Sequence, residues 1–267
     1  EVGFVARVLL SGYYGFGNVG DEAILASTVE SLRAMNPSLQ ISVLSANPEE
    51  TARVYDVVTY DRMSPRLIIK AIVESDLVVF GGGSLLQDDS SFRSLLYYLS
   101  IIFGARILGR PAVVYANGIG PIHSWVGRML TRLALSTVKR VTVRDPESER
   151  LLKRIGVTKP VRVTADPAFL LSPCSPERRD EILRKAGVDG DDPIVWLALR
   201  PGKAPDNFYL SFVPAIQYLR SKGYHPCLLV MQEQDKSLAP VINEALSKKG
   251  LEAAPYVSGT TPRETLA

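Results

Sequence analysis

The sequence contains few of the residues that bind metals or form disulfides. Its two cysteines, Cys174 and Cys227, and its two histidines, His123 and His225, are well separated along the chain. No CxxC pair is present, which excludes a disulfide scaffold and is typical of a reducing compartment. A structural zinc site needs four closely arranged ligands. We therefore expect neither a metal site nor a bound cofactor.

Long hydrophobic runs and targeting segments are also lacking. The most apolar stretch, Leu95–Leu108, is interrupted by Gly104 and Arg106 and is too short to cross a bilayer, so we interpret it as a core helix. The first residues, 1–4, have no charged leader and no cleavage site. These features predict a cytoplasmic protein.

Acidic residues are missing from one long segment. Residues 90–144 contain no Asp or Glu, although the whole chain has a net charge of only +3, which does not indicate nucleic-acid binding. The basic residues of this segment are Arg93, Arg106, Arg110, Arg128, Arg132, Lys139, Arg140 and Arg144. Such an uneven distribution creates a positive surface field. It reflects either chance among buried helices, or attraction to anionic substrate groups or to an anionic membrane face, where the protein would be peripheral.

Short apolar runs alternate with segments of helical periodicity almost from the first residue. Apolar runs between helices are typical of a parallel sheet that is covered on both faces. The expected strands of the first part are 8–10, 41–44, 57–60, 77–80, 112–115, 141–143 and 161–163, and the expected helices are 21–35, 48–54, 65–73, 92–108, 124–137 and 146–155.

A second alternation follows a linker rich in Pro and Ser at residues 171–176. Its expected helices are 177–187, 207–222 and 238–248, a further one starts at 261–262, and its expected strands are 194–199, 227–231 and 254–257. We therefore predict an α/β protein with two Rossmann-like domains, 1–172 and 173–267. The second domain has few strands and the sequence stops within a starting helix, so we expect it to be incomplete.

The first glycine loop, residues 15–20, matches the G-x-G-x-x-G pattern of dinucleotide-binding loops. Two features disagree with that interpretation. Asp21 and Glu22 occupy the first helical turn, where they would repel a pyrophosphate. No acid follows the second strand, at 44–47, to bind an adenosine ribose. The alternatives are a tight turn before a capped helix, or a ligand loop in which Asp21 or Glu22 takes part in the chemistry.

Other polar and glycine-rich loops follow later strands. Ligands of open α/β sheets bind at the carboxyl ends of the strands, so each loop is a candidate site. These loops contain Gly82, Gly83, Ser84, Gln87 and Asp88; Asn117, Gly118 and Gly120; Arg144; and Asp166. An arginine that ends a buried strand is costly unless it meets an anion, internal or bound. Arg144 and, in the second domain, Arg200 are such residues, and we expect Arg200 to face the cleft between the domains. Asp145 also has the features of a helix N-cap.

Five motifs carry a family resemblance. They are Gly17-Asn18-Val19-Gly20-Asp21-Glu22-Ala23, Gly81-Gly82-Gly83-Ser84-Leu85-Leu86-Gln87-Asp88, Gly118-Ile119-Gly120-Pro121, Arg144-Asp145-Pro146-Glu147-Ser148 and Thr164-Ala165-Asp166-Pro167-Ala168. In this order and at these strand ends, they resemble the polysaccharide pyruvyl transferase family, and most closely its CsaB branch. The resemblance extends from about residue 8 to residue 201.

The resemblance implies a two-domain fold similar to GT-B glycosyltransferases, with the active site between the domains. It implies phosphoenolpyruvate as donor and a ketal on an N-acetylmannosamine-type sugar. For this branch the acceptor is a lipid-diphosphate-linked precursor of a secondary cell-wall polymer that anchors S-layer proteins. The family also has an Arg-Leu-His motif with a catalytic His, and this sequence ends before it.

The chemistry assigns roles to the candidate residues. Ketal formation needs an acid, a base for the sugar hydroxyls and cations for the donor's phosphate and carboxylate. We expect Asp21, Arg144 and Arg200 to be catalytic, with Asp21 as the base or as the group that orients the acceptor, and Asp166 as a second candidate. The expected substrate-binding residues are Asn18, Gly20, Glu22, Gly82, Gly83, Ser84, Gln87, Asp88, Asn117, Gly118, Gly120 and Asp166.

Two other functions remain open at this point. A nucleotide-sugar glycosyltransferase would have the same architecture, and fold alone does not separate the two. A polysaccharide-binding protein without catalysis is the alternative of another class.

Overall fold

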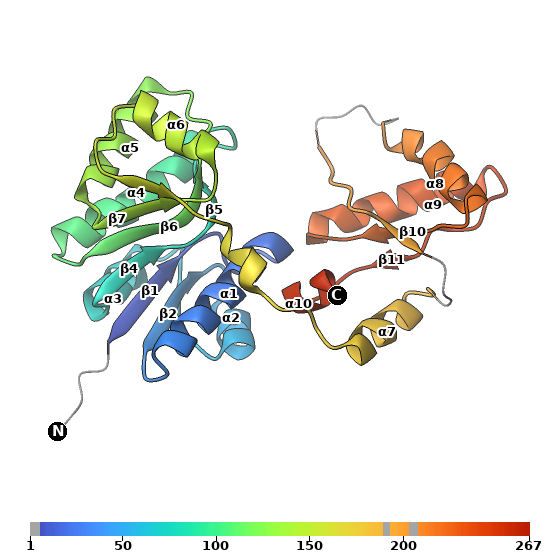
Figure 1. Cartoon of the computed structure of the whole chain (residues 1–267), viewed down its shortest axis with the longest axis horizontal. Helices are drawn as coiled ribbons and strands as arrows, with labels where there is room; N and C mark the ends of the chain where they lie inside the picture. Colours follow the sequence, from blue (N-terminus) through green and yellow to red (C-terminus); the bar gives the residue numbers. More distant parts are fainter. Residues whose placement is uncertain (1–5, 189–192, 203–207) are drawn as a thin grey trace. The chain divides into compact units, whose positions relative to one another are not determined.

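The computed structural model describes residues 6–188, 193–202 and 208–267 and divides the chain into two compact units (Figure 1). The first unit takes in the segment up to Phe16 and Gly20–Leu171. The second takes in Gly17–Val19 and Ser172–Ala267. Each unit has its own parallel sheet and its own core. The predicted α/β class with parallel sheets is confirmed.

The described part of the first unit contains an eight-stranded sheet. The strands are β1 (Arg7–Ser11), β2 (Gln40–Ser45), β3 (Val58–Asp61), β4 (Leu77–Phe80), β5 (Gly83–Leu86), β6 (Ala112–Ile119), β7 (Arg140–Val143) and β8 (Val161–Val163). Their order is β3-β2-β1-β4-β6-β7-β8, and β5 pairs with the far end of β6. All pairs are parallel, so the carboxyl ends of the strands meet at one edge.

Helices cover both faces of this sheet. They are α1 (Val19–Met35), α2 (Pro48–Tyr55), α3 (Pro65–Glu74), α4 (Phe92–Ile107), α5 (Trp125–Thr137) and α6 (Pro146–Arg154), and a short 3₁₀ helix follows at Pro167–Leu170. Polar side chains define where several of them begin, because each accepts a hydrogen bond from a backbone amide of the first turn. Asp145 is one of these caps: its Oδ1 accepts from the Ser148 amide at 2.7 Å, as the sequence predicted.

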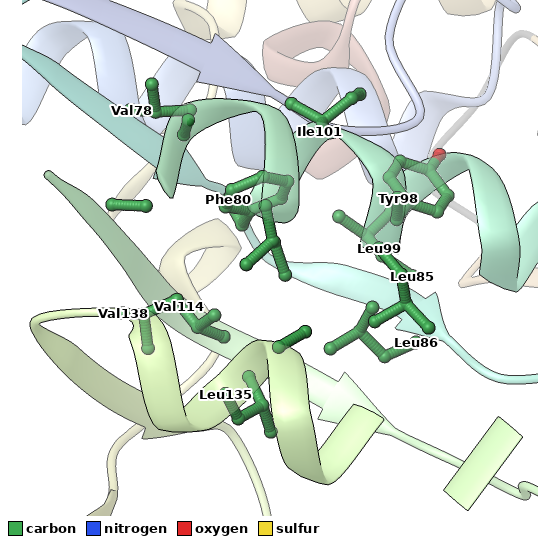
Figure 2. Packing of buried hydrophobic residues seen from close by; sticks show 14 of the residues in the cluster. Val78, Phe80, Leu85, Leu86, Tyr98, Leu99, Ile101, Val114, Leu135 and Val138 are labelled. Carbon is green, nitrogen blue, oxygen red and sulfur yellow. The ribbon is translucent and has the colours of Figure 1, made fainter. Parts of the chain in front are cut away.

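Two apolar clusters separate these helices into layers. The larger cluster joins the sheet to α3–α6, with Phe80, Tyr98, Leu99 and Leu135 at its centre (Figure 2). The other cluster, on the opposite face, joins α1 to the strands through residues such as Leu25. Right-handed crossovers between parallel strands explain this division. The chain first adds β2 and β3 on one side of β1 and then adds β4, β6, β7 and β8 on the other side, so the connecting helices of these two parts lie on opposite faces of the sheet.

The second unit is smaller. Its described strands are β9 (Ile194–Leu197), β10 (His225–Leu229) and β11 (Tyr256–Val257), in the order β11-β10-β9 and all parallel. Its helices are α7 (Pro176–Lys185), α8 (Phe212–Ser221), α9 (Leu238–Ser247) and α10 (Pro262–Leu266), with 3₁₀ turns at Tyr209–Ser211 and Glu233–Ser237. A core of α8, α9 and β10 residues stabilises it.

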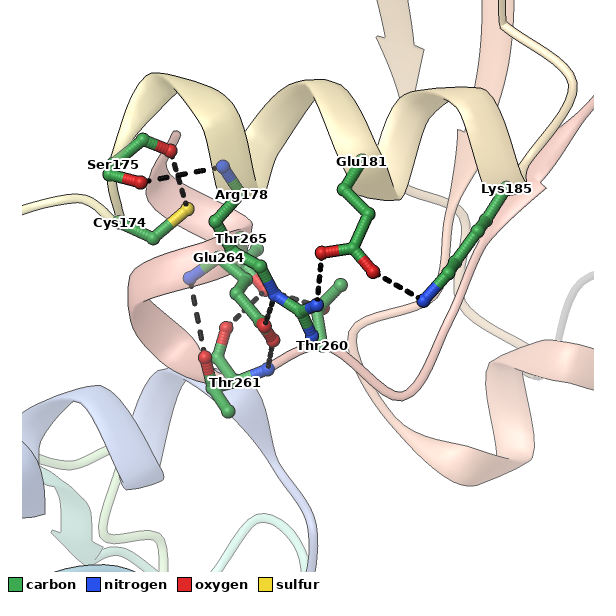
Figure 3. Close-up of polar contacts among 9 residues, drawn as sticks. All are labelled: Cys174, Ser175, Arg178, Glu181, Lys185, Thr260, Thr261, Glu264 and Thr265. Atoms are coloured by element: carbon green, nitrogen blue, oxygen red, sulfur yellow. Dashed lines mark hydrogen bonds and ion pairs between the residues drawn. The ribbon is translucent and has the colours of Figure 1, made fainter.

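Ion pairs connect α7 to α10 within the second unit (Figure 3). The Arg178 guanidinium bridges Glu264 and Glu181, each at 2.7 Å, and Lys185 lies 2.6 Å from the other oxygen of Glu181. Hydrogen bonds from Lys185 and then Arg178 lower the pKa of Glu181 to about 2. Thr261 and Glu264 form a capping box that begins α10.

The strands near the candidate site differ from the sequence prediction. Gly83–Leu86 was expected to be a loop but forms β5. The strand expected to end at residue 115 continues to Ile119, so Asn117 and Gly118 lie in a strand rather than in the loop after it. The prediction was wrong here because glycine and asparagine disfavour strands by propensity, whereas tertiary hydrogen bonds described below hold them in one.

The second unit shows smaller differences. His225 was predicted to precede a strand but is the first residue of β10, paired with Ile194. The helix expected over 207–222 begins at Phe212, after a 3₁₀ turn, and residue 207 lies outside the described residues. The strand expected to reach residue 199 ends at Leu197. Arg200 therefore lies in the loop after β9.

Candidate active site

The Gly81–Gly83 turn between β4 and β5 lies at the carboxyl edge of the first sheet and is closely packed. A Cβ atom on Gly81 would lie 2.0 Å from the Tyr14 hydroxyl, and one on Gly83 would lie 2.7 Å from Oδ1 of Asp21. Gly83 also has φ of +85°, which side chains rarely adopt. A Cβ atom on Gly82 would lie 3.1 Å from a side-chain carbon of α1. Glycine is required here because α1 and the β1–α1 loop approach the backbone.

Asn117 holds this turn in place. Its side chain is buried, its amide donates to the Gly81 carbonyl at 2.6 Å, and its Oδ1 accepts from the Leu85 amide at 3.4 Å. A buried amide must be hydrogen-bonded to avoid a desolvation cost. Asn117, predicted to bind substrate, is thus engaged in joining β4, β5 and β6.

Three side chains fix Arg144 at the same edge, and the longest of these contacts is the 3.8 Å between its Nε and Oδ2 of Asp145. Its Nη1 lies 2.8 Å from Oδ2 of Asp166, and its Nη2 donates to Oγ of Ser84 at 2.9 Å. Its guanidinium covers Gly118, where a Cβ would lie 2.9 Å from Nε. The side chain remains 32% exposed. Arg144 therefore meets an internal anion and still presents part of its guanidinium outward, where it could bind a second one.

Asp21 lies at the same carboxyl edge of the sheet as Arg144. Its carboxylate packs against Gly83, and Gly83 pairs with Asn117 across β5 and β6. Gly118 follows Asn117, and the Arg144 guanidinium packs against it. The structure therefore brings Ser84, Arg144 and Asp166 into contact and places the Asp21 carboxylate at the same sheet edge.

Glu22 is bound within the glycine loop. Its Oε1 accepts from the Gly15 amide at 2.8 Å, and its Oε2 accepts from the Tyr55 hydroxyl at 2.8 Å. Burial raises the pKa of Glu22, although these two hydrogen bonds act in the opposite direction. The carboxylate occupies a loop amide that a dinucleotide-binding loop would direct at a phosphate.

Tyr14 is a residue of this edge that sequence reasoning missed. Its side chain is buried, and its hydroxyl has no hydrogen-bond partner among the described residues. Burial, then the charges of Asp21 and Glu22, raise the pKa of Tyr14. It therefore stays a neutral hydroxyl beside two carboxylates.

Arg62 is a second residue that was missed. It is buried after β3, and its guanidinium donates to the Gly12 carbonyl at 2.8 Å and to the Tyr98 hydroxyl at 3.1 Å. Four aromatic rings surround it within 6 Å of the guanidinium carbon: Tyr13, Phe16, Tyr97 and Tyr98. No carboxylate among the described residues forms an ion pair with it. The argument used for Arg144, that an arginine following a buried strand needs a partner, would have identified it.

Three other predicted residues maintain the loops. The Gln87 side chain bonds both the hydroxyl and the amide of Ser90, at 2.6 and 3.0 Å. Gly120 has φ of +95°, and a Cβ there would lie 2.3 Å from Leu151. Asp88 accepts from the backbone amides of residues 123 and 124 at 2.7 and 2.8 Å. Burial would raise the pKa of Asp88, but these bonds outweigh it and lower the pKa.

The remaining predicted residues lie elsewhere. Asn18 and Gly20 flank the first residue of α1 and both have interaction partners. Arg200 is exposed in the second unit, where its carbonyl accepts from the Tyr209 hydroxyl at 3.0 Å.

A large cavity of about 870 Å³ lies within the second unit but contains none of the predicted residues. Two of its basic residues, Arg178 and Arg220, are already engaged: Arg178 with carboxylates and Arg220 with the carbonyls of Glu252 and Ala253. We therefore place the candidate site at the edge of the first sheet instead. Within residues 6–188, 193–202 and 208–267, no group of three His, Cys, Asp or Glu could hold a metal ion. No helix in those ranges is long and apolar enough to cross a membrane.

Solved structures define the class of fold. The chain is similar to a glycosyltransferase from Rickettsia africae, with a TM-score of 0.62 and 13% identity over 98% of this chain and 71% of that one. It is also similar to the UDP-GlcNAc 2-epimerase of Neisseria meningitidis, with a TM-score of 0.61 and 12% identity over 97% and 74%. The heptosyltransferase II of E. coli gives 0.51 and 16% over 97% and 75%. The fold is thus that of GT-B glycosyltransferases and UDP-GlcNAc epimerases.

The family follows from the sequence. The polysaccharide pyruvyl transferase model matches residues 18–256, which include four of the five motifs in full and the first from Asn18 onward. The chain belongs to the polysaccharide pyruvyl transferase family, and is therefore a transferase of the kind that uses phosphoenolpyruvate to modify polysaccharides. No curated protein sequence matches it significantly.

The raised pKa of Glu22 predicts a pH-dependent stability. A carboxyl whose pKa is higher in the folded than in the unfolded state stabilises the fold below the unfolded value, and that contribution is lost as the pH rises through the folded value. Glu22→Gln keeps an acceptor for the Gly15 amide but does not ionise. We expect the variant to gain unfolding free energy relative to the wild type from acid to neutral pH, measured by urea denaturation.

Glu49→Gln is the matched control, because Glu49 is exposed in the first turn of α2. The difference in unfolding free energy between Glu49→Gln and the wild type should not show the pH dependence expected for Glu22→Gln. If the stability difference for Glu22→Gln stays constant across this range, or reverses, burial does not control the protonation of Glu22.

Proposed function

We propose that the protein transfers a pyruvyl group from phosphoenolpyruvate to an N-acetylmannosamine-type sugar of a lipid-linked secondary cell-wall polymer precursor. The product is a ketal, and phosphate is released. The observation that carries the proposal is that a fixed, partly exposed Arg144 and the carboxylate of Asp21 both lie at the carboxyl edge of the first sheet.

The reaction determines what the site must supply. A proton adds to the methylene carbon of phosphoenolpyruvate and leaves a cationic carbon that one sugar hydroxyl attacks. The phosphate leaves with its C–O bonding pair, and the second sugar hydroxyl closes the ketal as both hydroxyl protons are released. The site therefore needs cations for an anionic donor and a base for neutral hydroxyls.

Arg144 fits the donor role. Its guanidinium matches phosphate and carboxylate bidentately, and Asp166 and Ser84 hold it in one orientation. Positioning of this kind reduces the entropy lost on binding. We also propose a role in donor binding for Arg200, the second arginine that the sequence analysis singled out. Asp166 then acts through Arg144 as a positioning residue.

Asp21 fits the acceptor role. A carboxylate in the first turn of a helix is stabilised in its charged form, and a charged carboxylate accepts hydrogen bonds from sugar hydroxyls. We also assign substrate contacts to the backbone of Gly82, Gly83 and Gly118 at the same edge. We assign contacts with the remainder of the substrates to Asn18, Gly20, Ser84, Gln87, Asp88 and Gly120, and an indirect role through the loops to Glu22 and Asn117.

The identity of the acceptor is the most specific part of the proposal. It depends on the resemblance of the five motifs to the CsaB branch, in which the pyruvylated polymer anchors S-layer proteins. A lipid-linked acceptor would place the enzyme in the cytoplasm at the inner membrane face. The fold also suits a nucleotide-sugar glycosyltransferase, as the similarity to solved glycosyltransferases indicates. We favour pyruvyl transfer because Glu22 occupies the Gly15 amide and Asp21 lies beside it.

The experiment that tests the function supplies phosphoenolpyruvate and a lipid-linked ManNAc-GlcNAc acceptor without added metal. We expect phosphate release together with an acceptor mass gain equal to one pyruvyl ketal. Activity with UDP-sugars instead would replace the proposal with glycosyl transfer. Polysaccharide binding without turnover of either donor would favour a non-catalytic protein.

Replacing Asp21 tests the assignment of the base. Asp21→Asn keeps the size of the side chain but removes the basic oxygen, so we expect kcat to fall by roughly 10²- to 10⁴-fold, with the thermal unfolding midpoint little changed. Asp56→Asn is the matched control, since Asp56 is fully exposed at the C-cap of α2, where asparagine also adopts the left-handed conformation. A normal kcat for Asp21→Asn would refute this role.

Adding one methyl group at Gly118 tests the position of Arg144. The new Cβ would lie 2.9 Å from Nε of Arg144 and displace the guanidinium. We expect Gly118→Ala to raise KM for phosphoenolpyruvate by roughly ten- to hundredfold, because hydrogen bonds to charged groups contribute about 1.5–3 kcal/mol. Gly104→Ala in α4 adds the same group at an ordinary 3.6 Å contact and should leave KM unchanged. Equal KM values for the two variants would contradict the assignment.

A further inference from the structure

Helices α3, α4 and α5 of the first unit carry large apolar side chains on their outer sides. They include Ile69, Val73, Leu96, Ile107, Trp125, Met129 and Leu133, and Met63 lies just before α3; Ile107 is 82% and Trp125 is 73% exposed. The three helices pack side by side on one face of the sheet. We call their outer sides the α3–α5 face. Exposed apolar groups gathered in this way mark an interaction surface.

A groove runs between α3 and α4 within this face. Its volume is about 300 Å³, and its walls include Met63, Ile68, Ile69, Ile101 and Leu108. The walls are mostly apolar, and Arg62, Tyr97 and Ser100 are the side chains in them that carry polar groups. The groove fits a hydrocarbon chain better than a sugar or a nucleotide.

Positive charge surrounds these apolar groups. Arg66, Arg93 and Arg106 are exposed on α3 and α4, and none of them forms an ion pair with another described residue. Helices α4 and α5 contain no acidic residue, and the one acid of α3, Glu74, forms an ion pair with Lys70 of the same helix at 3.9 Å. The positive field of this face is therefore little neutralised from within.

Exposed apolar groups together with these arginines fit one of two possible partners, a second copy of the chain or a lipid bilayer, better than the other. A second copy of the chain, bound symmetrically through this face, would place two sets of arginines against each other. A bilayer with anionic headgroups instead attracts arginines at its surface and accepts exposed apolar side chains below it. Tryptophan, here Trp125, is favoured at that interface.

We propose that the α3–α5 face docks onto an anionic lipid bilayer, with Ile69, Ile107 and Trp125 inserted among the headgroups and acyl chains. This surface goes beyond the pyruvyl transfer proposed above and does not depend on it, because neither donor nor acceptor takes part in docking. Its position differs from that of the candidate site, which lies at the edge of the same sheet.

Sedimentation with vesicles tests the docking. The chain is mixed with phosphatidylcholine vesicles that contain or lack phosphatidylglycerol, at low and at high sodium chloride. We expect binding to the anionic vesicles, weakened by salt. The double change Ile69→Ser and Ile107→Ser should weaken it at least about fivefold through lost apolar burial. Arg93→Gln and Arg106→Gln should each weaken it about fivefold.

The matched control is the double change Met35→Ser and Val54→Ser. Both side chains are exposed, on α1 and α2, and vesicle binding should be unaffected. Absence of binding to anionic vesicles, or equal loss in the control, would overturn the proposal. Light scattering that shows a dimer dissolved by Ile69→Ser and Ile107→Ser would also overturn it in favour of a second copy. None of these outcomes depends on pyruvyl transfer.

Discussion

A parallel sheet covered on both faces leaves polar side chains few places except its ends, and this constraint organises the first unit. Central residues such as Leu9, Leu10 and Val78 have no exposed surface. Asn117 is, like Ser11 and Ser45, a polar residue buried inside the sheet. Its amide supplies the hydrogen bonds that the Gly81–Gly83 turn leaves unmade. Without it, a carbonyl and an amide would be buried without partners at the edge that carries the candidate site.

The same edge accommodates two arginines in different ways. Arg144 forms ion pairs with Asp166 and Asp145, and its side chain stays partly exposed. Arg62 has no carboxylate partner among the described residues and is stabilised by carbonyl and hydroxyl oxygens and by aromatic faces, which interact with a cation through their π electrons. Burial raises the pKa of Tyr98 to about 12, against the opposing charge of Arg62. Arg144 can therefore bind a ligand with the exposed part of its side chain. Arg62 instead holds the β1–α1 loop in place through its contacts with Tyr13 and Phe16.

The sequence predicted the layers of the fold well because local patterns determine them. Apolar runs between capped helices specify a covered parallel sheet, and the strand order then places the polar strand ends together. It did not predict β5, because a strand that begins with Gly83 has no local preference and depends on Asn117, more than 30 residues away. Tyr14 was missed for a related reason. Its sequence context is that of any aromatic residue, and only the tertiary packing buries its hydroxyl beside Asp21.

The glycine loop illustrates how one sequence pattern serves two chemistries. In a dinucleotide site, the loop amides and the helix start attract phosphate. Here the Gly15 amide binds the carboxylate of Glu22, and Asp21 lies in the next position of the first turn. This end of α1 therefore carries negative charge and favours hydrogen-bond donors such as sugar hydroxyls over anions. The positive group, Arg144, comes from β7 instead. The edge thus has an acidic part and a cationic part, and this separation suits a neutral acceptor and an anionic donor better than it suits a nucleoside diphosphate at the loop.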